Sequence, residues 1–147
     1  MGCFILTYLL IVSAAFSTSE WLNFTSSQGI NAIVDDGEYL WAGGGGLIKL
    51  NKVTGEMIRY TSASSGLPDN SIWLHGLMKD SKGNLWIGTS SGGLAKFDGE
   101  NWVVYNTHNS DLPDDDIWDI EEDLDGNIWV ATFKGLAKFD GKGWTIY

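Results

Sequence analysis

Cysteine and basic residues are scarce in this chain of 147 residues. Its single cysteine, Cys3, excludes an internal disulfide framework and a cluster of thiolate ligands around a metal. Nine lysines and arginines stand against 19 aspartates and glutamates, so the formal net charge at pH 7 is −10. Because a chain of that charge repels phosphate backbones, the composition argues against a nucleic-acid partner.

Proline is also rare, with two residues, whereas glycine is abundant, with 19. That balance favours many tight turns over a disordered linker. No stretch of the sequence keeps the apolar i, i+3, i+4, i+7 spacing of an amphipathic helix. The length is that of about one domain, and the 44% of apolar residues, with eight tryptophans in the chain, suffices for a core.

One uncharged apolar run lies near the amino terminus, at residues 4–16 (FILTYLLIVSAAF). It is too short for a membrane-spanning helix, which needs about 20 apolar residues, and it has the length of the apolar part of a secretory signal. Small residues at Ser13, Ala15 and Ser17 predict a signal peptide over residues 1–17, cleaved after Ala15 or Ser17. The alternative is a buried first strand. Export to the periplasm or the extracellular space suits a mature chain without cysteine.

Three tracts of the sequence repeat one another. Trp41, Trp86 and Trp129 each follow a leucine or isoleucine and lie 45 and 43 residues apart. A matching segment follows each tryptophan: GLIKLN at 46–51, GLAKFD at 93–98 and GLAKFD at 135–140. A period of 42–45 residues with several matching positions indicates a repeat architecture.

Each tract reads as four short strands. In the third tract, a strand at 117–122 leads into a DLDGN turn; in the second, strands at 85–89, 94–97 and 102–105 are separated by turns rich in Gly, Asn and Asp. The sequence therefore predicts an all-β fold. Because a four-stranded unit of about 45 residues has the size of one β-propeller blade, we expect blades over residues 30–60, 70–105 and 115–147.

The third tract, with LPDDDIW at 112–118 and DGNIWVAT at 125–132, resembles the two-component-regulator propeller repeat. Residues 67–89 resemble it again, and residues 30–60 look like a degenerate copy. The resemblance extends over residues 21–147 and implies a periplasmic sensor propeller, usually seven-bladed and often ahead of a membrane-anchored histidine kinase. Other members of the family are exported propellers without a kinase. The second tract has two more residues between its Leu-Pro loop and Asp80 than the third has before Asp123, which predicts a bulge or a longer loop.

Residues 21–25 (WLNFT) have the pattern of the last strand of a blade, without three strands before them. Closed propellers use such an orphan strand to complete the last blade, but here the third blade already has its own last strand. The sequence thus predicts an orphan strand and three blades, an incomplete propeller. Either the chain is a piece of a longer protein that supplies the remaining blades, or copies of it associate.

Two tryptophans differ from the other six. Tryptophans that recur at one position of the repeat are expected to pack between blades. Trp73 and Trp118 instead follow the Leu-Pro loops and open the first strands, which line the central channel of a propeller. Exposed there, they would stack on a sugar ring or another flat ligand; the alternative is that they too are buried in packing.

Ionisable residues give few signs of chemistry. His75 and His108 are the only histidines, and neither has a partner at metal-ligand spacing. The turn at Asp123 copies only part of a calcium loop and is explained by hairpin formation, and the acidic run 114–116 by a solvated loop. Motifs for nucleophilic catalysis, phosphate binding or dinucleotide binding are absent from the sequence. We therefore predict no catalytic residue, metal or cofactor, and nominate Trp73, His75, Trp118 and Asp119 as ligand-binding residues.

Three functions fit these observations. The first is a non-catalytic, exported ligand-binding or sensor propeller segment that takes a carbohydrate-like or other small ligand. The second is an enzyme on a similar propeller, of the streptogramin-lyase kind. The third is a structural or adhesive propeller on the cell surface.

Overall fold

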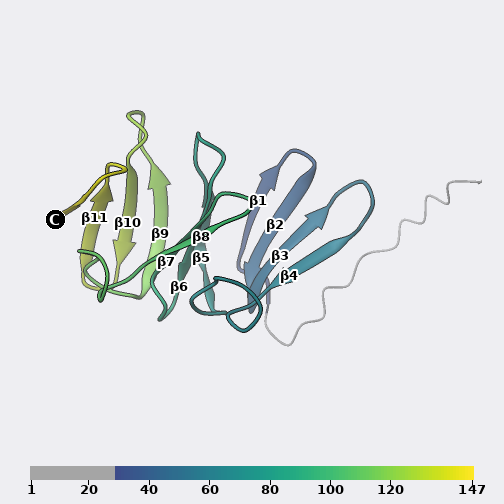
Figure 1. The fold of residues 1–147 in the computed structure, drawn as a ribbon, viewed down its shortest axis with the longest axis horizontal. Helices are drawn as coiled ribbons and strands as arrows, with labels where there is room; N and C mark the ends of the chain where they lie inside the picture. The colour runs from purple at the N-terminus through teal and green to yellow at the C-terminus, as the bar shows by residue number, and fades with distance from the viewer. Residues whose placement is uncertain (1–28) are drawn as a thin grey trace, which may run out of the picture.

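A computed structural model describes residues 29–147, and these residues form twelve strands and no helix (Figure 1). This confirms the predicted all-β fold. The predicted signal peptide and the predicted orphan strand at 21–25 lie outside the described residues. In residues 29–147 no helix has the length and apolarity to cross a membrane.

The twelve strands fall into three consecutive groups of four. The strands are β1 (Ala32–Asp36), β2 (Tyr39–Gly44), β3 (Gly46–Asn51), β4 (Met57–Tyr60), β5 (Ile72–Lys79), β6 (Leu85–Thr89), β7 (Leu94–Phe97), β8 (Trp102–Tyr105), β9 (Ile117–Glu122), β10 (Ile128–Thr132), β11 (Gly135–Phe139) and β12 (Trp144–Ile146). Four of them, β6 to β9, have the bounds that the sequence predicts.

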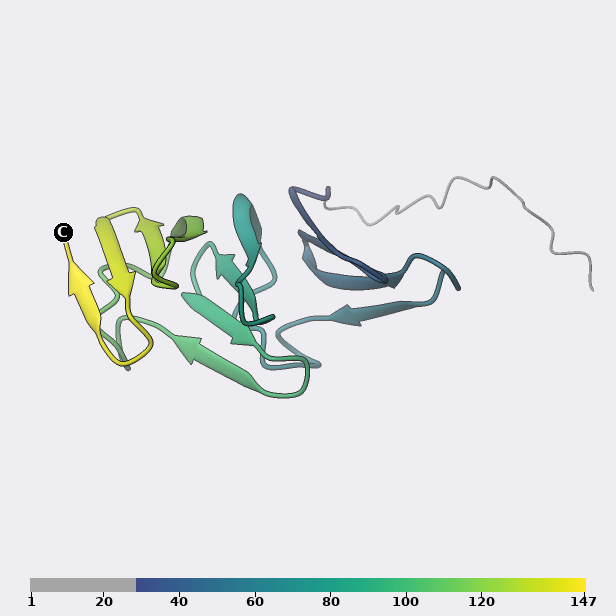
Figure 2. The same ribbon diagram turned by 90° about the horizontal axis from the view of Figure 1, so that it is seen from above.

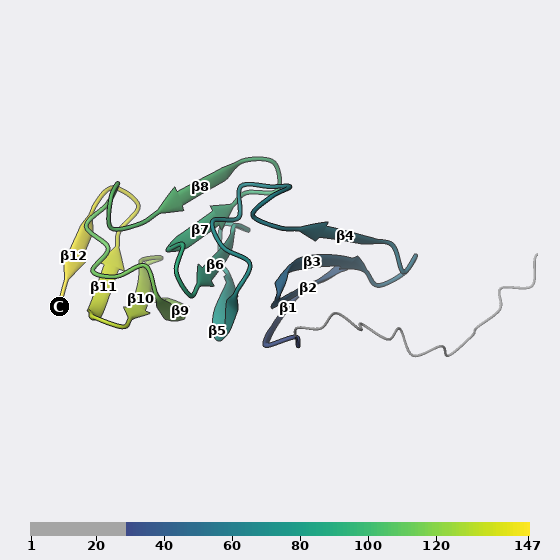
Figure 3. The same cartoon turned by 90° about the horizontal axis from the view of Figure 1, so that it is seen from below.

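Each group is an antiparallel meander and forms one blade. Strands β1 to β4 form a separate sheet, whereas blades 2 and 3 join into one eight-stranded sheet through a single parallel bridge between β5 and β9. The blades stand side by side as an open arc, with β1, β5 and β9 on the inner side and β4, β8 and β12 on the outer side (Figures 2 and 3). The described residues therefore form an incomplete propeller of three blades.

The hairpins between the first two strands of a blade depend on one aspartate and one glycine. In blade 3, Asp123 accepts hydrogen bonds from the backbone N–H of Asn127 at 2.9 Å and from Nε1 of Trp129 at 2.8 Å. In blade 2, Asp80 accepts the corresponding hydrogen bonds from the backbone N–H of Asn84 and from Nε1 of Trp86. Gly126, at a φ of 79°, supplies the left-handed turn residue. This confirms that the DLDGN segment is a hairpin turn.

Aromatic rings fill the space between blades. Trp86 of blade 2, 2% exposed, stacks on Tyr105 with ring centroids 6.0 Å apart and meets Phe139 of blade 3 edge-on at 6.1 Å. Trp41 of blade 1 meets Phe97 of blade 2 edge-on at 6.0 Å. The repeat-position tryptophans of blades 1 and 2 are thus inter-blade packing residues, as the sequence predicts.

Close backbone approach accompanies this packing. A Cβ atom placed on Gly88 of β6 would lie 2.6 Å from the Cγ2 atom of Ile117, the first residue of β9. Gly43 of β2 stands in the same relation to Ile72 of β5, at 2.8 Å. Glycine in the second strand of one blade therefore lets the inner strand of the following blade lie directly against it.

Strand β5 contains the predicted irregularity. Ile72 pairs with Thr89 and Leu77 pairs with Ile87, so four residues of β5 lie opposite one residue of β6. In blade 3 the corresponding shift spans only one unpaired residue, Trp118. The two additional residues of the second tract are therefore accommodated as a bulge in β5.

Candidate ligand site on the inner rim

A pocket of about 410 Å³ lies where the inner strands of blades 2 and 3 begin. Its walls come from β5, from β9 and the loop before it, and from the turn between β10 and β11. The lining residues are Trp73, Leu74, Asp116, Trp118 and Phe133. The two tryptophans that the sequence singled out thus share one pocket.

The apolar side chains of this pocket are exposed although they are large. Trp73 is 44% exposed, Trp118 49% and Phe133 64%. Tryptophan and phenylalanine otherwise dominate buried cores, so an exposed group of them in a concave surface is typical of a binding site. The alternative prediction, that Trp73 and Trp118 are buried in the core, is therefore wrong.

Specific contacts hold the rings in place. Nε1 of Trp73 donates a hydrogen bond of 2.8 Å to Oδ1 of Asp116, which links blade 2 to the loop before β9. Trp118 and Phe133 meet edge-on, with ring centroids 5.7 Å apart. The backbone N–H of Phe133 donates to the carbonyl oxygen of Asp116 at 3.1 Å. A ligand would therefore meet rings whose positions are fixed before it arrives.

Lys134, next to Phe133, is paired with an aspartate. Its Nζ lies 2.8 Å from Oδ2 of Asp114. This hydrogen bond lowers the pKa of Asp114 and raises the pKa of Lys134. The ion pair connects the β10–β11 turn to the loop before β9, and each of these two segments forms part of the pocket wall.

His75 and Asp119 do not line this pocket. They lie opposite each other in the parallel bridge that joins β5 to β9. Asp119 also accepts a hydrogen bond of 2.9 Å at Oδ1 from the backbone N–H of Ile120. His75 and Asp119 therefore contribute to the junction of the two inner strands and not to the pocket.

Sequence reasoning missed Leu74, Asp116 and Phe133. Asp116 belongs to the acidic run interpreted as a solvated loop, and within that loop it lines the pocket and accepts the hydrogen bond from Trp73. Phe133 follows the second strand of its blade at a position where blade 2 has Ser90. A large aromatic residue in a turn where another blade has serine was the signal available in the sequence.

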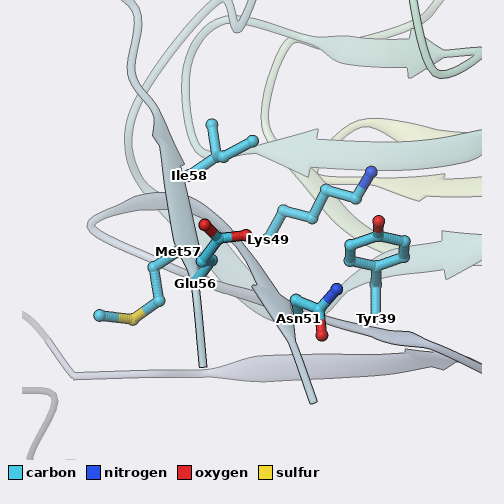
Figure 4. A pocket seen from close by; sticks show the side chains of 6 residues that line it. All are labelled: Tyr39, Lys49, Asn51, Glu56, Met57 and Ile58. Carbon is cyan, nitrogen blue, oxygen red and sulfur yellow. The ribbon is translucent and has the colours of Figure 1, made fainter. Parts of the chain in front are cut away.

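A second hollow lies on blade 1 and is lined by Tyr39, Lys49, Asn51, Glu56, Met57 and Ile58 (Figure 4). The ammonium group of Lys49 lies 3.9 Å from the centre of the Tyr39 ring and 5.3 Å from that of Trp41. Lys96 over Trp86 and Lys138 over Trp129 repeat this arrangement in the other blades. Because it recurs in every blade, we assign it to packing and not to a site.

Two segments of the chain match a known family. Residues 66–91 and 111–134 match the two component regulator propeller. These segments are two-component-regulator propeller repeats. They contain the loops and strands that carry Trp73, Asp116, Trp118 and Phe133. No protein of curated function matches the sequence.

Several solved structures share the fold of these propeller repeats. The extracellular domain of the putative hybrid two component system BT3049 from B. thetaiotaomicron superposes with a TM-score of 0.68 at 23% identity, over 82% of this chain and 17% of that chain. The corresponding domain of BT4673 gives 0.60 at 25% identity, over 81% and 16%. A streptogramin B lyase gives 0.63 at 21% identity, over 85% and 42%.

This chain thus spans about a sixth of the length of the two sensor domains and less than half of the length of the lyase. Two segments of this chain therefore match the two component regulator propeller, and the described residues have the β-propeller fold. In residues 29–147, no group of three or more His, Cys, Asp or Glu side chains is arranged to hold a metal ion.

Proposed function

We propose that this chain is a non-catalytic, ligand-binding segment of an exported sensor propeller. The observation that carries the proposal is the group of three exposed aromatic rings in one pocket on the inner rim. The ligand we propose is a carbohydrate or a similar small molecule with a flat apolar face, because such a face stacks on tryptophan while its hydroxyl groups remain hydrogen-bonded.

The position of the pocket supports a sensing role. It is built from two strands and two loops of blades 2 and 3, so a bound ligand would bridge these blades. The backbone pairing between the inner strands of blades 2 and 3 is the single bridge between His75 and Asp119. A ligand there would stabilise one relative arrangement of the two blades, and that is how binding would become a signal to a longer chain.

The test is binding of neutral oligosaccharides, with xylotriose, cellotriose and N-acetylated chitotriose as probes. We expect at least one probe to quench tryptophan fluorescence and to give a calorimetric isotherm. Trp118→Ala should weaken that binding several-fold, because a stacked ring contributes about 0.5–1.5 kcal/mol beyond burial. The melting temperature of this variant should differ little from that of the natural chain, since the Trp118 side chain is half exposed.

Trp86→Ala is the matched control, because it removes the same side chain from a buried position between blades 2 and 3. It should lower the melting temperature strongly. If Trp118→Ala lowers stability as much as Trp86→Ala and leaves binding unchanged, Trp118 is a packing residue and the proposed site is wrong.

Export is the second part of the proposal. It rests on the apolar run at residues 4–16 and is consistent with the extracellular origin of the similar sensor domains. We expect the mature protein to begin at Phe16 or Thr18, which N-terminal sequencing of exported material would establish. A folded, soluble protein that retains Met1 would contradict it.

The similarity to streptogramin B lyase makes a lyase the alternative function. Turnover of a streptogramin B antibiotic by the purified chain would favour that alternative over a non-catalytic sensor. Binding to a host cell surface or matrix without any small ligand would instead favour a structural or adhesive propeller.

A further inference from the structure

We propose that the pocket on the inner rim selects sugars that carry a protonated amine over neutral sugars and over sugars that carry a carboxylate. This inference rests on the proposed function, because it concerns the charge of the ligand in the same pocket. It follows from the charges that surround the aromatic rings.

The one charged side chain that lines the pocket is acidic. Asp116 lies in the wall beside Trp73 and Trp118. Its Oδ1 atom accepts the hydrogen bond from Trp73, and Oδ2 receives no hydrogen bond from the described residues. Because a carboxylate oxygen only accepts, this second oxygen suits an ammonium or hydroxyl donor of a ligand and opposes another carboxylate.

The nearby cation is already neutralised. None of the described residues that line the pocket is basic. Lys134 adjoins Phe133 in the chain, but its Nζ pairs with Asp114 at 2.8 Å. An anionic ligand would therefore find no free positive charge in the wall of the pocket, and entering it would cost repulsion from Asp116.

Aromatic rings strengthen the preference for a cation. The faces of indole and phenyl rings carry negative electrostatic potential, so a protonated amine over Trp73, Trp118 or Phe133 is attracted to them. The chain as a whole carries a net charge of −10, which raises the local concentration of cationic ligands. An amino sugar combines this amine with a ring that stacks on tryptophan.

The experiment compares three trisaccharides at pH 6 in low salt: fully deacetylated chitotriose, N-acetylated chitotriose and trigalacturonate. We expect the deacetylated form to bind about tenfold more tightly than the acetylated form, the scale of one charge-assisted hydrogen bond, and trigalacturonate to bind most weakly. Binding of the deacetylated form should weaken as salt is added, whereas binding of the neutral form should not.

Asp116→Asn tests the residue that carries the inference. The amide keeps an acceptor for Trp73 and removes the charge, so the preference for the deacetylated sugar should fall about tenfold while neutral binding persists. Glu100→Gln is the matched control, because it removes one charge from an exposed turn in blade 2, outside the pocket. It should leave the preference unchanged.

The outcomes separate this inference from the proposed function. Equal binding of neutral and amino sugars, both weakened by Trp118→Ala, would overturn the charge preference and leave the sugar site intact. Tighter binding of trigalacturonate would reverse the preference and overturn it as well. If none of the three sugars binds, the proposed sugar site and its proposed charge preference are both wrong.

Discussion

Trp86 and Trp129 occupy the same position in consecutive blades, yet their surroundings differ. Trp86 is 2% exposed and contacts rings of its own blade and of blade 3. Trp129 is half-buried and stacks on Tyr147 of its own blade, with ring centroids 5.4 Å apart. The repeat predicts the same inter-blade role for both, but of these two tryptophans Trp86 alone, within the described residues, contacts an aromatic ring of a following blade.

This difference predicts unequal stability losses. Trp86→Ala should lower the free energy of unfolding by about 3–5 kcal/mol, as expected for a fully buried tryptophan, and Trp129→Ala by clearly less. Urea denaturation followed by circular dichroism measures both. Equal losses would mean that Trp129 is covered in solution by something other than blades 1 to 3.

The turn aspartates predict a dependence of stability on acid. Hydrogen bonds from Asn127 and Trp129 lower the pKa of Asp123 from 3.8 to about 2. Burial raises the pKa of Asp80, but donors from Asn84 and Trp86 outweigh it and the pKa is lowered as well. A carboxylate whose pKa is lowered by folding stabilises the native state above its unfolded pKa, and this stabilisation is lost as the pH falls through the native pKa.

We therefore expect the melting temperature to fall as the pH is lowered from about 4 to 2, the window between the unfolded and folded pKa values of Asp123. Asp123→Asn should be less stable at pH 7, because the amide holds the Trp129 and backbone donors more weakly, and should lose less on acidification. Thermal denaturation at several pH values measures this. Parallel curves for the variant and the natural chain would rule out Asp123 as a source of the acid sensitivity.

At the scale of strands, the spacing between blades depends on glycines that the neighbouring blade touches. Gly88→Ala would place a methyl carbon 2.6 Å from Cγ2 of Ile117 and 2.9 Å from its Cβ. Because both are part of a packed inter-blade contact, we expect a loss of about 1–3 kcal/mol in the free energy of unfolding. Chemical denaturation of the variant measures the loss.

Gly143→Ala is the matched control, since a Cβ there meets no atom within 4 Å and its φ is not in the left-handed region. The double variant Gly88→Ala/Ile117→Ala should be less destabilised than the sum of its single changes, because the alanine at 117 removes the Cγ2 atom that clashes. Strict additivity would show that the two strands do not meet at this point.

How far the sequence predicts the structure is clearest in these strands. The repeat and the turn residues that separate the strands predict the bounds of β6 to β9, because a blade is a local meander. The bulge in β5 is predicted only as an irregularity, since two additional residues in a tract do not say which residues leave the ladder. Their location between Ile72 and Leu77 decides that Trp73 joins Trp118 while His75 pairs with Asp119.

The candidate site was predicted in part for the same reason. Trp73 and Trp118 stand out because they follow the Leu-Pro loops and open the first strands, which a single sequence reveals. Asp116 and Phe133 come from a loop and a turn, and their approach to the tryptophans depends on how blades 2 and 3 meet. The contact between blades 2 and 3 arises only when the arc assembles, so the spacing of residues along one blade does not predict it.

For the whole molecule, the two end faces of the arc present apolar side chains. On blade 1, Ile33 and Met57 are 65% and 51% exposed, on the side of the sheet away from blade 2. The matching positions in blade 2 are Leu77, 8% exposed, and Trp102, which packs against the core between blades 1 and 2. On blade 3, Leu136 and Tyr147 are exposed at 38% and 63%. Each end face is therefore built like a surface that contacts another blade within the arc.

These faces predict that the isolated chain of 147 residues self-associates, with the blade 3 face of one copy against the blade 1 face of another. The contact would repeat the one that already occurs between blades 1 and 2 and between blades 2 and 3, and monomers rarely leave apolar patches of more than a few hundred Å² exposed. Light scattering should give a mass that rises with protein concentration. Met57→Glu should reduce this association, because it places a charge on the blade 1 face, whereas Val53→Glu, at an 85% exposed position of the β3–β4 turn, should not. A stable, cooperatively unfolding monomer at all concentrations, or equal effects of the two variants, would show that blade faces of this kind do not pair between copies.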